Sequence, residues 1–181
     1  MSLELNFNRN PLIRRVLLYP DPTLNKVSKP VLTDIVTDTE LQNLMDDMVA
    51  TMKAFQGVGL SAIQIGVPLK VLVVQGETEP LKIINPVIQE LEGESWLTEG
   101  CLSIPGFYTR VKRPDEVLIE YFNEKGERKT TINDGLLGRA ILHEMDHLLG
   151  LTIFDKLSRV ERSVALEKYR KLRKKFKLNA A

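Results

Sequence analysis

The sequence predicts an α+β fold, with short, mainly antiparallel strands around a central helix and a further helix at the C-terminus. Two observations support this prediction. Short segments rich in Val and Ile gather in the middle of the 181-residue chain, where we expect strands. Apolar residues with helical spacing precede and follow these segments, whereas a parallel βαβ fold would alternate helices with strands.

The N-terminal part predicts an extended segment followed by one helix. Four prolines between residues 11 and 30 disfavour a long helix there. From Glu40 to Phe55, apolar residues recur at steps of three and four, which is typical of an amphipathic helix that ends before Gly57. The apolar positions are Leu41, Leu44, Met45, Met48, Val49, Met52 and Phe55.

The middle of the chain predicts strands. Glu124–Gly126 has the composition of a hairpin turn that leads into a strand at Arg128–Ile132, because Gly adopts the backbone angles that tight turns need. The other predicted strands are Leu69–Gln75, Leu81–Gln89, Glu92–Leu97 and Glu116–Asn123.

Two helices are expected after the strands. Helical spacing returns at about Asp134–Leu149, and Gly150 is expected to end this central helix. Ser158 and Glu161 have the spacing of a capping box, so the last helix is expected to run from Ser158 to about Lys177.

Length and composition indicate a single domain in the cytoplasm. A chain of 181 residues with 43% hydrophobic and 27% charged residues has the balance of a globular domain, which excludes the disordered and fibrous classes. One cysteine excludes an intrachain disulfide and suits a reducing compartment. We expect no membrane partner, because no apolar run reaches about 20 residues, and the N-terminus lacks the pattern of a secretory signal.

The charge is distributed unevenly. Residues 158–181 hold nine Lys or Arg and two Glu, whereas residues 1–157 have a net charge of −6. Basic residues at a helix end are often simply solvated, where they also complement the helix dipole. Seven basic residues between 168 and 177 also suit contact with the phosphates of RNA, so both interpretations stay open.

The two histidines of the chain, His143 and His147, are four residues apart. On a helix this spacing puts both rings on one face, so that they can bind a single metal ion, and the central helix becomes a predicted metal-binding helix. Glu144 is then placed to take a proton from a water molecule at the metal. The alternative is that both histidines are merely solvated on a surface helix.

Cys101 is the third candidate metal ligand. A lone cysteine is more often a small buried hydrophobic residue, but a thiolate beside two imidazoles completes a three-ligand set. With Cys101, His143 and His147, every Cys and His of the chain is used. The composition therefore favours a site with an open fourth position, as in catalytic metal centres.

Gly57–Gln64 forms the third motif, Gly-Val-Gly-Leu-Ser-Ala-Ile-Gln. It is a poor phosphate loop, because it follows a predicted helix and carries no P-loop lysine. It can be a plain helix end and turn, or a tight segment whose backbone approaches a ligand, with the Gln64 amide as a neutral donor.

The three segments together resemble the peptide deformylase family. Its signatures G-x-G-L-A-A-x-Q, E-G-C-L-S and Q-H-E-x-D-H correspond, in the same order, to Gly57–Gln64, Glu99–Ser103 and Leu142–His147. The similarity also includes Tyr19–Pro22 and Asn85-Pro86, and covers most of residues 12–155. Two departures stand out: Ser61 replaces the usual Ala, and Leu142 replaces a Gln beside the first histidine.

The resemblance implies the roles of the site residues. Cys101, His143 and His147 would bind the metal, Glu144 would be the general base, and Gln64 together with the Leu102 backbone N–H would hold the formyl oxygen. The implied reaction removes the N-formyl group from the N-terminal methionine of newly made proteins and releases formate. The substrate-binding candidates are Val58, Gly59, Leu97, Leu136 and Ala140, with Gly59 pairing with the substrate backbone as an added strand. The role of Arg139, at a pocket position that is usually apolar or basic, stays open.

The resemblance also implies the cofactor and the partners. A thiolate with two imidazoles suits Fe2+, Zn2+, Ni2+ or Co2+, and the family is usually described as using iron in cells. Relatives with a similar tail dock on the ribosome, so we expect rRNA contact through the basic helix at about 158–178, and no DNA partner. Residues 1–181 would then be a single catalytic domain. The alternatives are a general H-E-x-x-H peptidase, with Asp155 as the nearest further carboxylate, and a ribosome-binding module with a structural metal.

Overall fold

The computed structural model describes residues 9–175, and these have the predicted α+β fold. A five-stranded sheet with the strand order β1-β2-β3-β6-β7 is antiparallel throughout, and β4 and β5 form a separate antiparallel pair. The strands are β1 (Gly59–Ser61), β2 (Val71–Gln75), β3 (Pro80–Glu92), β4 (Ser95–Glu99), β5 (Thr109–Arg113), β6 (Glu116–Phe122) and β7 (Arg128–Asp134).

The three predicted helices are confirmed within a residue or two at the ends that the structure describes. They are α1 (Thr39–Ala54), α2 (Gly135–Leu148) and α3 (Arg159–Lys175). The prediction that the last helix continues to Lys177, and the interpretation of the N-terminus, concern residues outside the described range. Four short 3-10 helices connect the larger elements: η1 (Pro22–Asn25), η2 (Thr33–Ile35), η3 (Ala62–Ile65) and η4 (Ile153–Lys156).

One predicted strand is wrong, and two strands were not predicted. The segment Glu92–Leu97 is not a single strand, because Gly93 has a φ of 66° and the chain passes there from the five-stranded sheet to β4. β5 escaped prediction because its basic residues hide the pattern, and Arg113 is buried as an ion-paired residue rather than an apolar one. β1 lies inside the glycine-containing motif that suggested a turn.

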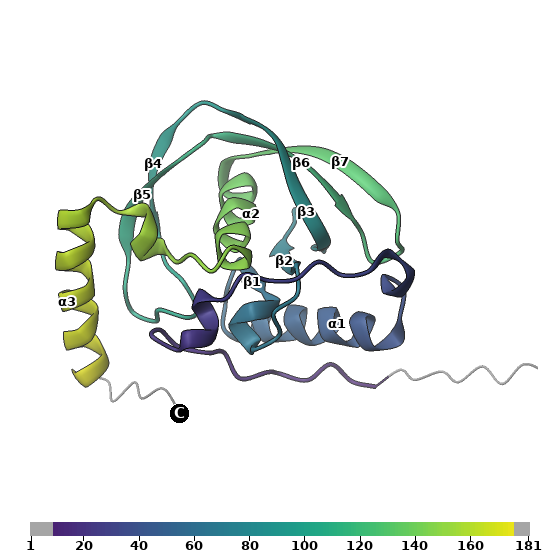
Figure 1. The fold of residues 1–181 in the computed structure, drawn as a ribbon, viewed down its shortest axis with the longest axis horizontal. Helices are drawn as coiled ribbons and strands as arrows, with labels where there is room; N and C mark the ends of the chain where they lie inside the picture. The colour runs from purple at the N-terminus through teal and green to yellow at the C-terminus, as the bar shows by residue number, and fades with distance from the viewer. Residues whose placement is uncertain (1–8, 176–181) are drawn as a thin grey trace, which may run out of the picture.

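The sheet separates two layers of the core, as Figure 1 shows with α1 below β1 and β2 and α2 above them. Val71 and Val73 of β2 pack in the cluster that includes Met45 of α1. Leu72 and Val74 pack in the cluster with α2. This two-residue alternation explains why residues 71–74 of β2 are all apolar, since both faces of the strand are buried there.

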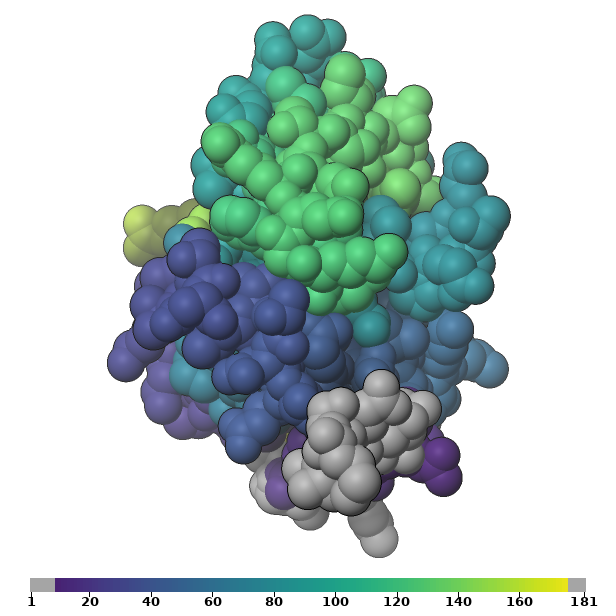
Figure 2. All heavy atoms as spheres, turned by 90° about the vertical axis from the view of Figure 1, so that its right-hand side faces the viewer, coloured from purple at the N-terminus to yellow at the C-terminus, as the bar shows by residue number. Residues whose placement is uncertain are grey.

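The hairpin and the C-terminal helix complete the fold. The turn between β6 and β7 is confirmed, with a φ of 76° at Gly126. On the face shown in Figure 2, this green segment lies against the blue start of α1, where Gln42 donates a hydrogen bond to the Glu124 carbonyl. α3 lies at the edge of the molecule and packs on η4 through Ala165 and Tyr169. Among the helices of residues 9–175, none has the length and apolar character of a membrane span.

Candidate active site

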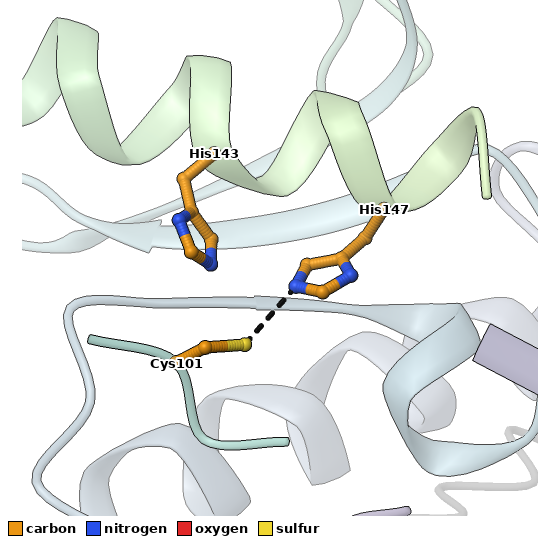
Figure 3. A group of neighbouring side chains, drawn as sticks. All are labelled: Cys101, His143 and His147. Atoms are coloured by element: carbon orange, nitrogen blue, oxygen red, sulfur yellow. Dashed lines mark hydrogen bonds between the residues drawn. The ribbon is translucent and has the colours of Figure 1, made fainter. Parts of the chain in front are cut away.

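The structure brings the three predicted metal ligands together. One possible ligand atom each of Cys101, His143 and His147 lies within 4.8 Å of the others. The Cys101 Sγ is 3.2 Å from the His147 Nε2. Figure 3 shows both imidazole rings projecting from the same side of α2 toward the cysteine, which lies on the loop that follows β4.

On α2, the candidate metal ligands and the core residues lie on different faces of the helix. His143 and His147 are one turn apart and face the site, whereas Ile141 and Leu148 pack into the core with the sheet. Leu142, the departure from the family signature, belongs to this core cluster and is buried. The departure therefore places an apolar side chain in the core at this position.

Glu144 is a buried carboxylate beside the metal ligands. Its Oε2 has no hydrogen-bond partner among the described residues. Burial raises the pKa of Glu144 to about 7, although the charge of His143 acts in the opposite direction. Gly59 faces this carboxylate closely, since a Cβ at Gly59 would lie 2.6 Å from the Glu144 Oε1. Any larger residue at position 59 would displace the carboxylate.

Gln64 lies at the site with a defined amide orientation. Its Oε1 accepts hydrogen bonds from the Ser61 backbone N–H at 2.8 Å and from the Ser61 hydroxyl at 2.9 Å. Its Nε2 donates to the Ser103 Oγ at 3.2 Å and lies 3.6 Å from the Cys101 Sγ. The donor end of the amide is therefore turned toward the cysteine. Ser61, the other departure from the family signature, contributes the hydroxyl to this arrangement.

A buried ionic network around Glu99 was not predicted from the sequence. The Glu99 Oε1 accepts from the Arg113 Nε at 2.7 Å and from the Arg139 Nη1 at 2.8 Å, and Oε2 lies 3.0 Å from the His143 Nδ1. Burial acts to raise the pKa of Glu99, but the hydrogen bonds from His143 and Arg113 outweigh it, and the pKa falls to about 2. Arg113 also donates to Asp146 at 2.7 Å. The available signal was the position of Glu99, two residues before a candidate ligand.

This network orients the imidazole of His143 but makes no hydrogen bond with the Nδ1 of His147. Because Glu99 occupies the His143 Nδ1, the Nε2 of that ring is left for the site. Burial lowers the pKa of His143, but contacts with Cys101 and Glu99 outweigh it and raise the pKa above its usual value. Burial, with the charges of His143 and Arg113, lowers the pKa of His147 and favours its neutral form. The buried His147 Nδ1 has no hydrogen-bond partner within residues 9–175.

A cavity of about 840 Å³ opens beside this site and is lined by Cys101, His143 and Glu144, whereas His147 and Gln64 lie behind its wall. Its lining includes four of the five predicted substrate-binding residues. Leu97 is the exception: it is 41% exposed and does not line the cavity. Arg139 takes up space between α2 and β4 there, since it reaches Ser95, which lies on the same face of β4 as Leu97 by the period of a strand. The predicted residues that line it are Val58, Gly59, Cys101, Leu102, Leu136, Ala140, His143 and Glu144.

Comparison with known proteins gives a consistent result. The family model described as polypeptide deformylase matches residues 13–163. A peptide deformylase of Bartonella tribocorum is 44% identical over 88% of this chain and 92% of its own. A peptide deformylase of Maricaulis maris is 42% identical over 93% of this chain and 99% of its own.

Solved structures agree with the sequence relatives. The crystal structure of a peptide deformylase from Legionella pneumophila has a TM-score of 0.82 and 39% identity, and covers 90% of this chain and 96% of that one. The enzyme from Ehrlichia chaffeensis in complex with actinonin has a TM-score of 0.81 and 34% identity, and covers 91% and 98%. With its signature motifs gathered around one cavity, this chain belongs to the polypeptide deformylase family.

Proposed function

We propose that this chain removes the N-formyl group from the N-terminal methionine of newly made proteins, at the site formed by Cys101, His143 and His147. As a member of its family, the chain is a metal-dependent hydrolase. The single observation that supports this site is that a thiol and two imidazoles converge beside a buried carboxylate, one oxygen of which has no hydrogen-bond partner among residues 9–175. The reaction is the hydrolysis of an amide, with formate and a free amine as products.

The donor set fits one divalent metal ion. Three protein ligands of the Cys and His types, close enough to share one ion, are the usual complement of a catalytic site with an open position. When bound, such an ion acts as a Lewis acid that lowers the pKa of water and polarises a carbonyl oxygen. We propose Fe2+ as the ion in cells, as is usual in the family, while Zn2+, Ni2+ and Co2+ also suit a thiolate with two imidazoles.

Glu144 is the proposed general base. Its carboxylate is buried at the cavity wall, and its Oε2 makes no hydrogen bond within residues 9–175, so this oxygen is available to an attacking water molecule. Glu144 takes the proton from that water as the bond to the formyl carbon forms. It then gives the proton to the leaving amine, so one carboxyl group serves as base and as acid.

Gln64 and the Leu102 backbone N–H are the proposed donors to the formyl oxygen. The orientation of the Gln64 amide, held at its oxygen by Ser61, supports this role because it turns the Nε2 donor toward Cys101. Donors that are already fixed stabilise the developing negative charge without reorganising during the reaction.

The substrate chain is proposed to lie along β1. This strand pairs with β2 on one side only, so Gly59 lies on the edge of the sheet, where an extended peptide can add as a further strand. Val58, Leu136 and Ala140 line the cavity nearby and give the methionine side chain an apolar surface.

The test is formate release from a short formyl-methionyl peptide by protein loaded anaerobically with Fe2+, and separately with Zn2+. We expect rapid release and no cleavage of the same peptide without its formyl group. Cleavage of the unblocked peptide without formate release would favour the general peptidase instead. The position of Asp155 does not favour the general peptidase, because this carboxylate is already used: it accepts a hydrogen bond from the Thr152 backbone N–H and pairs with Arg162 at 2.9 Å.

We also propose that α3 contacts ribosomal RNA, and that the chain acts as a single catalytic domain in the cytoplasm, where formylated chains emerge. The supporting feature is a row of Lys and Arg on a helix at the edge of the molecule. The test replaces Lys171 and Lys174 together by Glu, because truncation at residue 168 would remove the buried Tyr169. We expect weaker, salt-sensitive ribosome binding and unchanged turnover of a short peptide. Binding that does not depend on salt would contradict the proposal.

A further inference from the structure

A buried arginine forms part of the wall of the substrate cavity. Arg139 lines the cavity and is only 5% exposed. It lies four residues before His143, so the two share one face of α2 and are about 6 Å apart along the helix axis. Ala140, a small residue, is the next position and also lines the cavity. An apolar side chain that enters past Ala140 therefore meets Arg139 one helical turn from the metal ligands.

The guanidinium is fixed from three sides. Its Nη1 donates to the Glu99 Oε1 at 2.8 Å and to the Val111 carbonyl at 3.1 Å. Its Nη2 donates to the Ser95 carbonyl at 3.1 Å and to the Ser95 Oγ at 2.9 Å. These partners come from β4 and β5, so Arg139 ties α2 to the two-stranded sheet. A buried charge with this many partners keeps one rotamer and does not move aside for a ligand.

The hydrogen bonds that Arg139 makes within residues 9–175 use its two terminal nitrogens and leave its Nε–H without a partner there. Such a donor at a cavity wall distinguishes between side chains of equal length. A thioether sulfur is a weak hydrogen-bond acceptor, whereas a methylene group is not an acceptor at all. A hydrocarbon packed against the guanidinium removes water from it and returns no hydrogen bond.

We propose that Arg139 is a specificity-determining residue that selects a thioether side chain over a hydrocarbon of the same length. The inference rests on the proposed function, because it concerns the substrate of that site. Formyl-methionyl and formyl-norleucyl peptides differ only by sulfur in place of a methylene group. We expect kcat/KM to favour the methionyl peptide about threefold to tenfold, which corresponds to one hydrogen bond of ordinary net strength.

The experiment measures kcat/KM for both peptides with the wild-type protein and with Arg139→Leu. We expect the preference to disappear in the variant. Loss of the Arg139 bond to Glu99 also loosens His143, but that lowers both rates by one factor and leaves their ratio unchanged. The matched control is Arg110→Leu, which removes an exposed arginine of β5 that does not line the cavity. This control is expected to keep the preference.

A second variant keeps the proposal testable if Arg139→Leu does not fold. Arg139→Lys retains the charge but not the planar group, and we expect it to lose the preference as well. Equal kcat/KM values for the two peptides in the wild-type protein, or a preference that survives in both Arg139 variants, would overturn the inference. Failure of the wild-type protein to release formate from either peptide would instead overturn the proposed function.

Discussion

The helices α1 and α2 both bury paired charges, but of these two helices only α2 also holds buried side-chain atoms without a hydrogen-bond partner in the described part of the chain. In α1, Asp47 is fully buried and both of its oxygens are paired: Oδ1 accepts from the Leu12 backbone N–H at 2.7 Å, and Oδ2 accepts from Arg9 at 2.8 Å and Arg14 at 2.7 Å. In α2, the Glu144 Oε2 and the His147 Nδ1 have no hydrogen-bond partners within the described part of the chain.

This difference distinguishes a structural charge from a functional one. A paired buried carboxylate holds two segments together, and here Asp47 anchors the N-terminal segment to α1. A buried polar atom without a partner costs stability. Within residues 9–175 the Ser28 Oγ and the Tyr169 Oη are also buried without a partner, so it is the position of the Glu144 and His147 atoms beside Cys101 that makes them available to a reaction. The contrast therefore identifies α2, rather than α1, as the helix that carries chemistry.

Replacement of Glu144 by Gln has the largest expected effect. The amide keeps the shape of the side chain but cannot accept a proton from water, so we expect formate release to fall about 10²- to 10⁴-fold. Metal content and thermal unfolding should remain as in the wild-type protein, because the three ligands are untouched. Retention of more than a tenth of the activity would show that another group acts as the base.

The substitution Gln64→Leu has the next largest expected effect on activity. It removes the proposed donor to the formyl oxygen while keeping a side chain of similar size, and we expect kcat to fall about 10²- to 10³-fold. The measurement is steady-state hydrolysis of a formyl-methionyl peptide. Gln75→Leu is the matched control, since Gln75 is exposed at the end of β2. Equal losses in both variants would contradict a specific role for Gln64.

Asp47→Asn is expected to affect stability and not chemistry. We expect a loss of about 2 kcal/mol in the free energy of unfolding at pH 7, since charge-assisted hydrogen bonds are replaced and both arginines are partly exposed. Asp46→Asn is the control, because Asp46 is a half-exposed neighbour with one ion pair to Lys82, and its loss should be smaller.

The contribution of Asp47 to stability is expected to depend on pH, and Asp47→Asn tests this. Burial by itself raises the pKa of Asp47, but its hydrogen bonds outweigh burial and hold the pKa below 3.8. The folded-state pKa is therefore the lower one, so Asp47 stabilises the fold above about pH 4 and loses this effect as the pH falls through the folded-state pKa. The difference between wild type and Asp47→Asn in denaturant unfolding should shrink over that range. A difference that grows on acidification would contradict the assignment.

Ser61→Ala has the smallest expected effect. The backbone N–H of residue 61 still holds the Gln64 oxygen when the hydroxyl is lost, so we expect kcat/KM to fall only about threefold. In the Gln64→Leu background the same substitution should have a smaller effect, because the part that acts through that amide is lost and only the contact of Ser61 with Glu144 remains. An equal loss in both backgrounds would mean that the hydroxyl works on its own.

Local patterns were sufficient for a large part of the fold. The first two helices followed from apolar spacing, the last helix from its capping-box residues and the β6–β7 turn from its glycine, because these signals depend on residues a few positions apart. β5 was missed because Arg113 is buried only by virtue of Glu99 on β4 and Asp146 on α2, which lie 14 and 33 residues away. No local window contains all three residues.

The sequence by itself determined that His143 and His147 share one face of a helix, and that the chain holds only one cysteine to join them. Only the tertiary structure decided that Cys101 lies beside that helix, that Glu99 holds one imidazole, and that Arg139 rather than Leu97 forms part of the cavity wall. The physical reason is the separation along the sequence between the residues that interact. Helical spacing acts over one turn, whereas the partners of a buried charge are supplied by strands that meet it only when the whole chain has folded.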